Sequence, residues 1–152
     1  MDFVDIHQHV VYGMDDGART VEDSLRMLEA ARAEGIRVIV ATPHATPSLE
    51  CFPVERLERH LRLLNRLSRE RGLGVALYPG CEVFYSDIAL QKLIDGQLPT
   101  LAGSRFVLVE FDPTDSLRRI ADGLRHIANN GLIPVMAHCE RYPALVNDPA
   151  AA

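Results

Sequence analysis

The sequence has 152 residues, 47% hydrophobic content and a formal net charge of −5, which fits one globular domain, residues 1–152, with its own core. The acidic balance argues against nucleic acid as a partner, because neutralising phosphates requires a basic surface. The sequence lacks a run of roughly 18 apolar residues that could span a membrane and an N-terminal signal peptide, so we expect a cytoplasmic protein without membrane insertion.

Apolar runs alternate with helical patterns along the whole chain. Strands are predicted to open near residues 3, 37, 75, 105 and 133, where apolar and β-branched residues gather. Helices are predicted between them, from Thr20 to Gly35 and over 53–71, 86–95 and 116–130, and Thr20 and Asp23 have the spacing of a capping box. Five βα units in this order indicate a mainly parallel sheet, either doubly wound or part of a βα barrel.

Metal-binding side chains fall where the predicted strands end. The C-terminal ends of parallel strands lie on one side of the sheet, so these side chains are expected to converge on one surface. Four imidazoles and two carboxylates exceed what one tetrahedral zinc needs, and they suit two or three manganese, iron or zinc ions bridged by carboxylate. Such ions can activate a bridging water and clamp a phosphoryl group. The six candidates are His7, His9, His44, Glu82, Glu110 and His138.

Three further residues are candidates for supporting roles. Arg141 lies three residues after His138 and can bind a phosphate oxygen through its planar guanidinium. Asp5 and Asp16 can orient metal ligands through hydrogen bonds, although the Asp-Asp-Gly motif at 15–17 is more typical of a simple turn. In the absence of metal, Glu82 and Glu110 are expected to face each other and to raise each other's carboxyl pKa.

Other residues capable of chemistry have simpler interpretations. His60 and His126 fall within predicted helices, where we expect exposed or packed side chains. Arginines over 56–71 are interleaved with glutamates, which favours a solvated helix face over a nucleic-acid stripe. The cysteines, at positions 51, 81 and 139, form no Cys-x-x-Cys pair and are expected to be small buried hydrophobes.

Six short motifs occur in a fixed order along the chain: D-I-H-Q-H at 5–9, D-D-G at 15–17, A-T-P-H at 41–44, G-C-E-V-F-Y at 80–85, L-V-E-F at 108–111 and A-H-C-E-R-Y at 137–142. Together they resemble the polymerase and histidinol phosphatase (PHP) superfamily. Within it, the sequence is most similar to bacterial tyrosine-protein phosphatases that regulate capsule and exopolysaccharide synthesis. The resemblance extends from Met1 to Pro149 and implies a distorted (β/α)7 barrel with manganese-type metals at its C-terminal face.

The resemblance also implies an activity and a site. It implies hydrolysis of phosphotyrosine by a hydroxide that bridges up to three metal ions, on the tail of the kinase that drives polysaccharide polymerisation. It implies metal ligation by the six candidates above and phosphate binding by Arg141. Two alternatives stay open: a small-molecule phosphoesterase of the histidinol phosphatase type, and an inactive metal-binding remnant that acts by association.

The sequence departs from the PHP pattern after His138. The superfamily carries a late Asp-x-His pair that completes the metal site, and no such pair follows His138 here. We therefore expect a single, incomplete domain, truncated at its C-terminus, with about five parallel βα units and fewer metals than the complete site. Such a domain has an open sheet edge through which it could self-associate.

Overall fold

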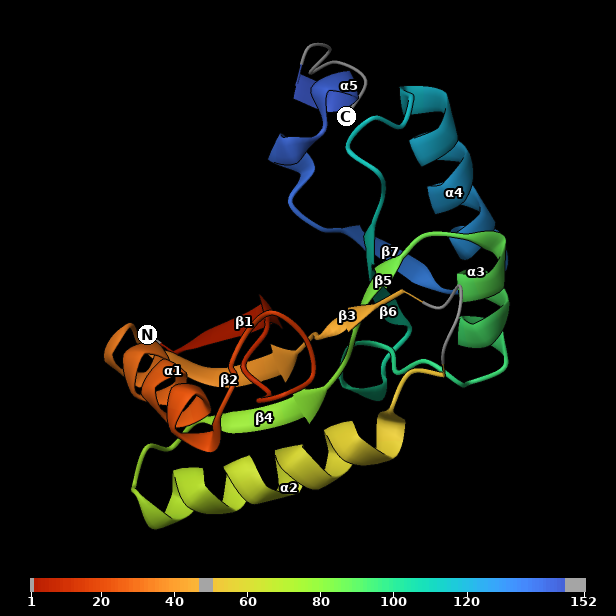
Figure 1. Cartoon of the computed structure of the whole chain (residues 1–152). Helices are drawn as coiled ribbons and strands as arrows, with labels where there is room; N and C mark the ends of the chain where they lie inside the picture. The colour runs from red at the N-terminus through yellow and green to blue at the C-terminus, as the bar shows by residue number, and fades with distance from the viewer. Residues whose placement is uncertain (1, 47–50, 147–152) are drawn as a thin grey trace.

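The computed structural model describes residues 2–46 and 51–146 (Figure 1). Strands and helices alternate in the predicted βα order, which is thereby confirmed. Their bounds in chain order are β1 (Phe3–Gln8), α1 (Val21–Ala33), β2 (Ile36–Ala41), β3 (His44–Ala45), α2 (Val54–Glu70), β4 (Ala76–Pro79), β5 (Glu82–Phe84), α3 (Asp87–Ile94), the 3-10 turn η1 (Leu101–Gly103), β6 (Phe106–Glu110), α4 (Leu117–Asn129), β7 (Ile133–Met136), the 3-10 turn η2 (Cys139–Arg141) and α5 (Pro143–Val146).

The strands form two sheets, in which every paired strand is parallel to its neighbour. The first sheet has the order β1-β2-β4, and the second has the order β3-β5-β6-β7. The outermost strand β1 exposes Phe3, Val4 and Ile6, and Val4 is 61% exposed. Self-association through this edge stays a prediction.

Two predicted strands each bend and continue in the second sheet. The first of these strands leaves the first sheet when β2 ends at Ala41 and continues as β3 from His44. The strand paired with it ends as β4 at Pro79 and continues as β5 from Glu82. Ala41 pairs with Pro79 and His44 pairs with Glu82, so both strands bend with their pairing register unchanged. The bend occurs beside Pro43, which has no N–H for a ladder bond. The second predicted strand therefore corresponds to β2 and β3, the third corresponds to β4 and β5, and the bend places His44 beside Glu82.

Helices cover the outer faces of both sheets. Helices α1 and α2 pack against the first sheet (Figure 1) and bury a core that includes Leu28, Ile39 and Leu57. Helix α4 packs against the second sheet, and its Ile120 shares a buried cluster with Val109 of β6. The predicted capping box at the start of α1 is present, with reciprocal side-chain to backbone hydrogen bonds. No helix in residues 2–46 and 51–146 is long and apolar enough to cross a membrane.

The last predicted strand is shorter than expected. It was expected to end at His138, but β7 ends at Met136 and His138 has a left-handed backbone conformation, with φ 32° and ψ 53°. This conformation is uncommon for a residue with a side chain, and here it turns the chain into η2. His138 therefore lies just beyond the strand.

Candidate metal centre

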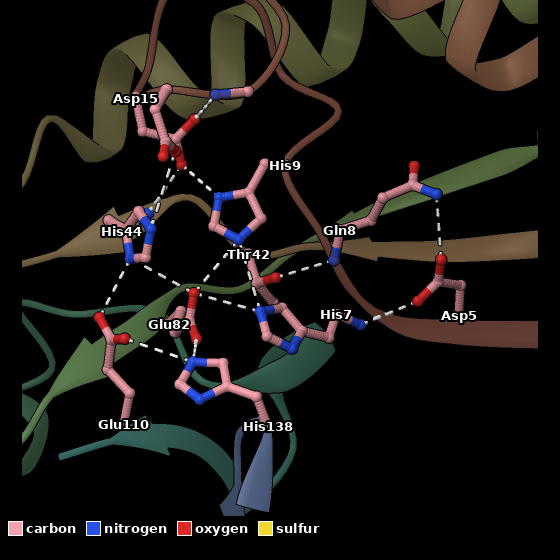
Figure 2. Close-up of polar contacts among 12 residues, drawn as sticks. Asp5, His7, Gln8, His9, Asp15, Thr42, His44, Glu82, Glu110 and His138 are labelled. Atoms are coloured by element: carbon pink, nitrogen blue, oxygen red, sulfur yellow. Dashed lines mark hydrogen bonds and ion pairs between the residues drawn. The ribbon is translucent and has the colours of Figure 1, made fainter. Parts of the chain in front are cut away.

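Glu82 lies at the centre of the six predicted ligands (Figure 2). Its side chain is 1% exposed, and its Oε2 lies 3.1 Å from His7 Nε2, 3.2 Å from His9 Nε2 and 3.3 Å from His44 Nδ1. Its Oε1 lies 2.9 Å from His138 Nε2. One buried carboxylate therefore contacts four imidazoles that come from three different segments of the chain.

Glu110 closes the opposite side of the cluster. Its Oε1 lies 3.1 Å from His44 Nδ1, and its Oε2 lies 3.4 Å from His138 Nε2. Glu110 ends β6, next to the β5 strand that begins with Glu82. The structure thus brings all six predicted side chains into one continuous network where the two sheets meet. There β1 and β6 end near His7 and Glu110, and β3 and β5 begin with His44 and Glu82.

The residues of this network fit a cluster of divalent metal ions. Imidazole nitrogens and carboxylate oxygens are the donors that manganese, iron and zinc prefer. Three overlapping groups each bring three such donor atoms within 4.8 Å of one another, and shared residues link the groups as bridging ligands would. The groups are His7 with His9 and Glu82, His9 with Asp16 and His44, and His44 with Glu82 and Glu110.

Ion pairs within the network determine its protonation. Burial raises the pKa of the Glu82 carboxyl, but hydrogen bonds from His7 and His9 outweigh that effect and hold it well below its usual range. Hydrogen bonds to Asp15 and Glu82 raise the pKa of His9 to about 10. The expectation that Glu110 raises the pKa of Glu82 is therefore wrong, because imidazoles lie between the two carboxylates and supply positive charge.

Asp15 is the carboxylate that orients two of the histidines. Its Oδ2 accepts hydrogen bonds from His9 Nδ1 at 2.6 Å and from the His44 backbone N–H at 2.9 Å. Its Oδ1 accepts a third bond from Gly17 N–H. The bond to Nδ1 leaves His9 Nε2 directed at Glu82, as in metal sites where a carboxylate fixes the ligand tautomer. The Asp-Asp-Gly motif indicated this loop, but its spacing did not identify which aspartate faces the ring.

Gly17 allows this loop to pack against the end of β1. A Cβ atom at position 17 would lie 2.2 Å from the His9 carbonyl oxygen, which is far inside van der Waals contact. The same carbonyl accepts a hydrogen bond from Ala18 N–H at 3.1 Å. Any side chain at position 17 would therefore push the loop, and Asp15 with it, away from His9.

The two aspartates proposed as supporting groups have different surroundings. Asp16 is 84% exposed and its Oδ1 lies 3.7 Å from His44 Nε2, which suits a direct ligand better than an orienting group. Asp5 accepts hydrogen bonds from the His7 backbone N–H and from Gln8 Nε2, both at 3.0 Å. Asp5 therefore stabilises the backbone of β1, and the contacts do not include the His7 ring.

Arg141 lies in η2, three residues after His138. Its side chain is exposed and forms no ion pair with a carboxylate in the described part of the chain. The guanidinium is thus available to an external anion, and its role as a phosphate ligand stays a prediction.

The two histidines outside the centre support the fold. His60 stacks on Tyr12 with ring centroids 4.0 Å apart, and its Nδ1 lies 3.1 Å from the Tyr12 carbonyl oxygen. This contact holds the loop after β1 against α2. His126 lies on α4, and its Nδ1 is 3.2 Å from the Tyr85 hydroxyl. His60 therefore packs against a neighbouring ring, whereas His126 is exposed, so each histidine meets one of the two expected outcomes.

The cysteines only partly match the sequence interpretation. Cys81 is buried and donates to the Pro99 carbonyl, and burial raises the pKa of its thiol. Cys51 and Cys139 are exposed, so the expectation that all three are buried is wrong. Cys139 lies in η2, which has no buried residue, and at the loop end before α2 it is Phe52, the neighbour of Cys51, that packs against the core.

The chain is similar to curated proteins that are named tyrosine-protein phosphatases. The chain is 36% identical over 145 residues to tyrosine-protein phosphatase CpsB of Streptococcus pneumoniae and 34% identical over 149 residues to tyrosine-protein phosphatase YwqE of Bacillus subtilis. The alignments cover 95% and 97% of this chain and 60% and 58% of those relatives. The chain thus spans about three fifths of the length of the curated relatives it matches.

The fold and a family model give the same assignment. A chain from the crystal structures of YwqE and CpsB, described as unique metal-dependent tyrosine phosphatases, superposes with a TM-score of 0.88 at 30% identity, covering 97% of this chain and 60% of that one. The parallel α/β fold is therefore of the expected PHP type. The model of the family described as "Capsular polysaccharide synthesis, CpsB/CapC" matches residues 3–152. The chain belongs to the CpsB/CapC family of capsular polysaccharide synthesis proteins.

Proposed function

We propose that this chain contributes the metal centre of a protein-tyrosine phosphatase that acts in capsule or exopolysaccharide synthesis. The observation that carries the proposal is the buried Glu82 carboxylate, which contacts four imidazoles beside Glu110. A carboxylate and imidazole network of this density suits a metallophosphoesterase. The names of its relatives support phosphotyrosine as the substrate.

The six network residues, with Asp16 as an additional ligand, would hold divalent ions, fewer than the three that the complete family site can take. Manganese is the metal we favour, and iron and zinc bind the same donors. Bound ions of this kind supply Lewis acidity toward phosphoryl oxygens and lower the pKa of water.

The remaining chemistry is assigned to the side chains themselves. His9 donates its Nδ1 proton in a hydrogen bond to Asp15. Its Nε2 is therefore the atom that faces the centre. Glu82 is excluded from water, which strengthens its electrostatic interactions. Arg141 would bind the phosphoryl oxygens through its planar guanidinium and stabilise the charge that they carry in the transition state.

The proposed substrate is a phosphotyrosine-bearing tail of the kinase that drives polysaccharide polymerisation, met in the cytoplasm. Arg141 is exposed and lies three residues after His138, which suits a phosphate carried on a flexible peptide. The resemblance in motifs and the capsule-related names of the relatives support this substrate over a small phosphomonoester.

Phosphate release after manganese loading tests the proposal. The chain should hydrolyse a phosphotyrosine peptide in preference to histidinol phosphate. Arg141→Ala should lower kcat/KM by about 100-fold, the typical loss for one donor to a developing anion. Arg118→Ala is the matched control, because Arg118 is 93% exposed on α4, and it should leave the rate unchanged. Preference for histidinol phosphate, or metal binding without turnover of either compound, would contradict the proposal.

A further inference from the structure

We infer that Tyr142 is a positioning residue that fixes Glu110 and His138 relative to each other. The inference rests on the proposed function in one respect, namely that these two side chains are metal ligands. Tyr142 lies in neither β6 nor β7 and has no donor atom in the candidate centre. Its effect on the centre would pass entirely through the two ligands.

The Tyr142 hydroxyl holds the segment that carries Glu110. Tyr142 is completely buried, and its hydroxyl oxygen accepts a hydrogen bond of 3.0 Å from the backbone N–H of Phe111. Phe111 follows Glu110 directly, so this bond fixes the peptide unit on which the Glu110 side chain depends. Loss of the hydroxyl would leave a buried N–H without its partner, which proteins rarely tolerate.

The hydroxyl replaces a strand partner at the point where β7 has ended. Ala137 N–H donates to Val109 O at 2.9 Å, which is the last of the bonds between these two segments. The next backbone N–H on that side of β6 belongs to Phe111. Because His138 adopts a left-handed conformation, the chain turns away there, and Tyr142, the residue after η2, places its hydroxyl against that N–H.

The Tyr142 ring supports the His138 ring. The two rings stack with centroids 5.9 Å apart and an interplanar angle of 24°. His138 Nδ1 is buried and has no hydrogen-bond partner in the described residues, whereas His9 Nδ1 is held by Asp15. The carboxylates contact His138 only at Nε2, so the Nδ1 side of the ring depends on packing for its orientation. Tyr142 supplies the stacked contact, and the His7 ring, tilted by 42°, lies at the same centroid distance of 5.9 Å from His138.

One side chain therefore contacts both partners of the Glu110 and His138 pair, whose Oε2 and Nε2 lie 3.4 Å apart. Residues that orient metal ligands typically change metal affinity by about 10–100-fold when they are replaced. Removal of the hydroxyl alone should give the lower end of that range, because the ring remains.

Manganese titration of Tyr142→Phe by calorimetry tests the inference on the full chain. The matched control is Tyr85→Phe, because Tyr85 is buried in the same core and its hydroxyl bonds to His126, away from the centre. Tyr142→Phe should weaken Mn2+ binding about 10-fold, and Tyr85→Phe should change it less than twofold. Equal affinity in wild type and Tyr142→Phe would overturn the inference while leaving the proposed function intact.

Histidine-ring NMR spectra of the metal-free proteins give a second readout that does not need metal. Tyr142→Phe should shift the His138 ring signals, and Tyr85→Phe should leave them in place. If wild type bound no Mn2+, the proposed function would fail, and these spectra would still decide the inference. Unchanged His138 signals in Tyr142→Phe, or equal shifts in both variants, would overturn it.

Discussion

Replacing Glu82 with Gln removes the central negative charge of the candidate metal centre with almost no change in volume. In the metal-free protein, the Glu82 carboxylate accepts hydrogen bonds from His7 and His9 and lies within 3.3 Å of His44 and 2.9 Å of His138. Gln keeps one acceptor oxygen but places an NH2 group against imidazole nitrogens. The substitution therefore breaks a buried ion network from its centre, and we expect Glu82→Gln to destabilise the metal-free protein at pH 7.

The size of the effect follows from the burial of this carboxylate. Removing one partner from a buried ion pair costs about 3–5 kcal/mol, and a hydrogen bond to a charged group contributes about 1.5–3 kcal/mol. Because Gln retains one acceptor, we expect a loss of about 3 kcal/mol. The pKa of Glu82 is lowered by folding, so its contribution is fully present above its unfolded value near 4.5 and is lost as the pH falls. At pH 7, the whole effect should be visible.

Thermal melts followed by circular dichroism, in EDTA and with excess Mn2+, measure this effect. A chain of this length loses about 2–4 °C per kcal/mol, so Glu82→Gln should melt roughly 6–12 °C lower in EDTA. Wild type should gain about 2.7 kcal/mol when free Mn2+ is 100 times its Kd, and the variant should gain almost nothing. Glu58→Gln is the control, because it removes only an exposed pair with Arg62 on α2 and should have an effect below about 1 kcal/mol.

One result would refute this reasoning directly. If Glu82→Gln melted at or above the wild-type temperature in EDTA, the carboxylate would be in net repulsion with Glu110, and the imidazoles would not carry the positive charge assigned to them. An equal gain from Mn2+ in both proteins would show that the ion binds without Glu82.

Three further outcomes follow from the loop after β1. Gly17→Ala should lower the free energy of unfolding by about 2 kcal/mol in a urea titration, since the added Cβ overlaps the His9 carbonyl; an unchanged midpoint would contradict the packing described. Asp15→Asn should weaken Mn2+ binding by about 10–100-fold in calorimetry, because His9 loses the carboxylate that holds its Nδ1 proton; unaltered affinity would show that the tautomer is held otherwise. The pKa of His9 is raised to about 10, so its contribution is fully present below its unfolded value of 6.5 and is lost as the pH rises toward 10. Stability of the metal-free protein, measured by urea titration, should therefore fall between pH 6.5 and 9.5, and His9→Gln should flatten that decline.

The sequence predicted the element order and the network because both depend on simple rules. Hydrophobic spacing located the helices, and the rule that parallel strands end on one side of a sheet brought His7, Glu110 and four other residues together. Such rules could not tell whether Asp15 or Asp16 binds the His9 ring, because this depends on how the loop backbone packs at Gly17. The end of β7 was also misplaced, since a left-handed residue at His138 has no signal in the local sequence.

The bend shared by the neighbouring strands constrains how the length of this chain can vary. Residues 38, 41, 44 and 45 pair with 76, 79, 82 and 83, an offset of 38 residues on both sides of the bend. A one-residue deletion between Ala41 and His44 alone would turn the His44 side chain to the opposite face of β3, because strand side chains alternate. A matching deletion between Pro79 and Glu82 would restore the pairing of His44 with Glu82. Homologues that gain or lose residues at one of these connections should therefore show a compensating change at the other.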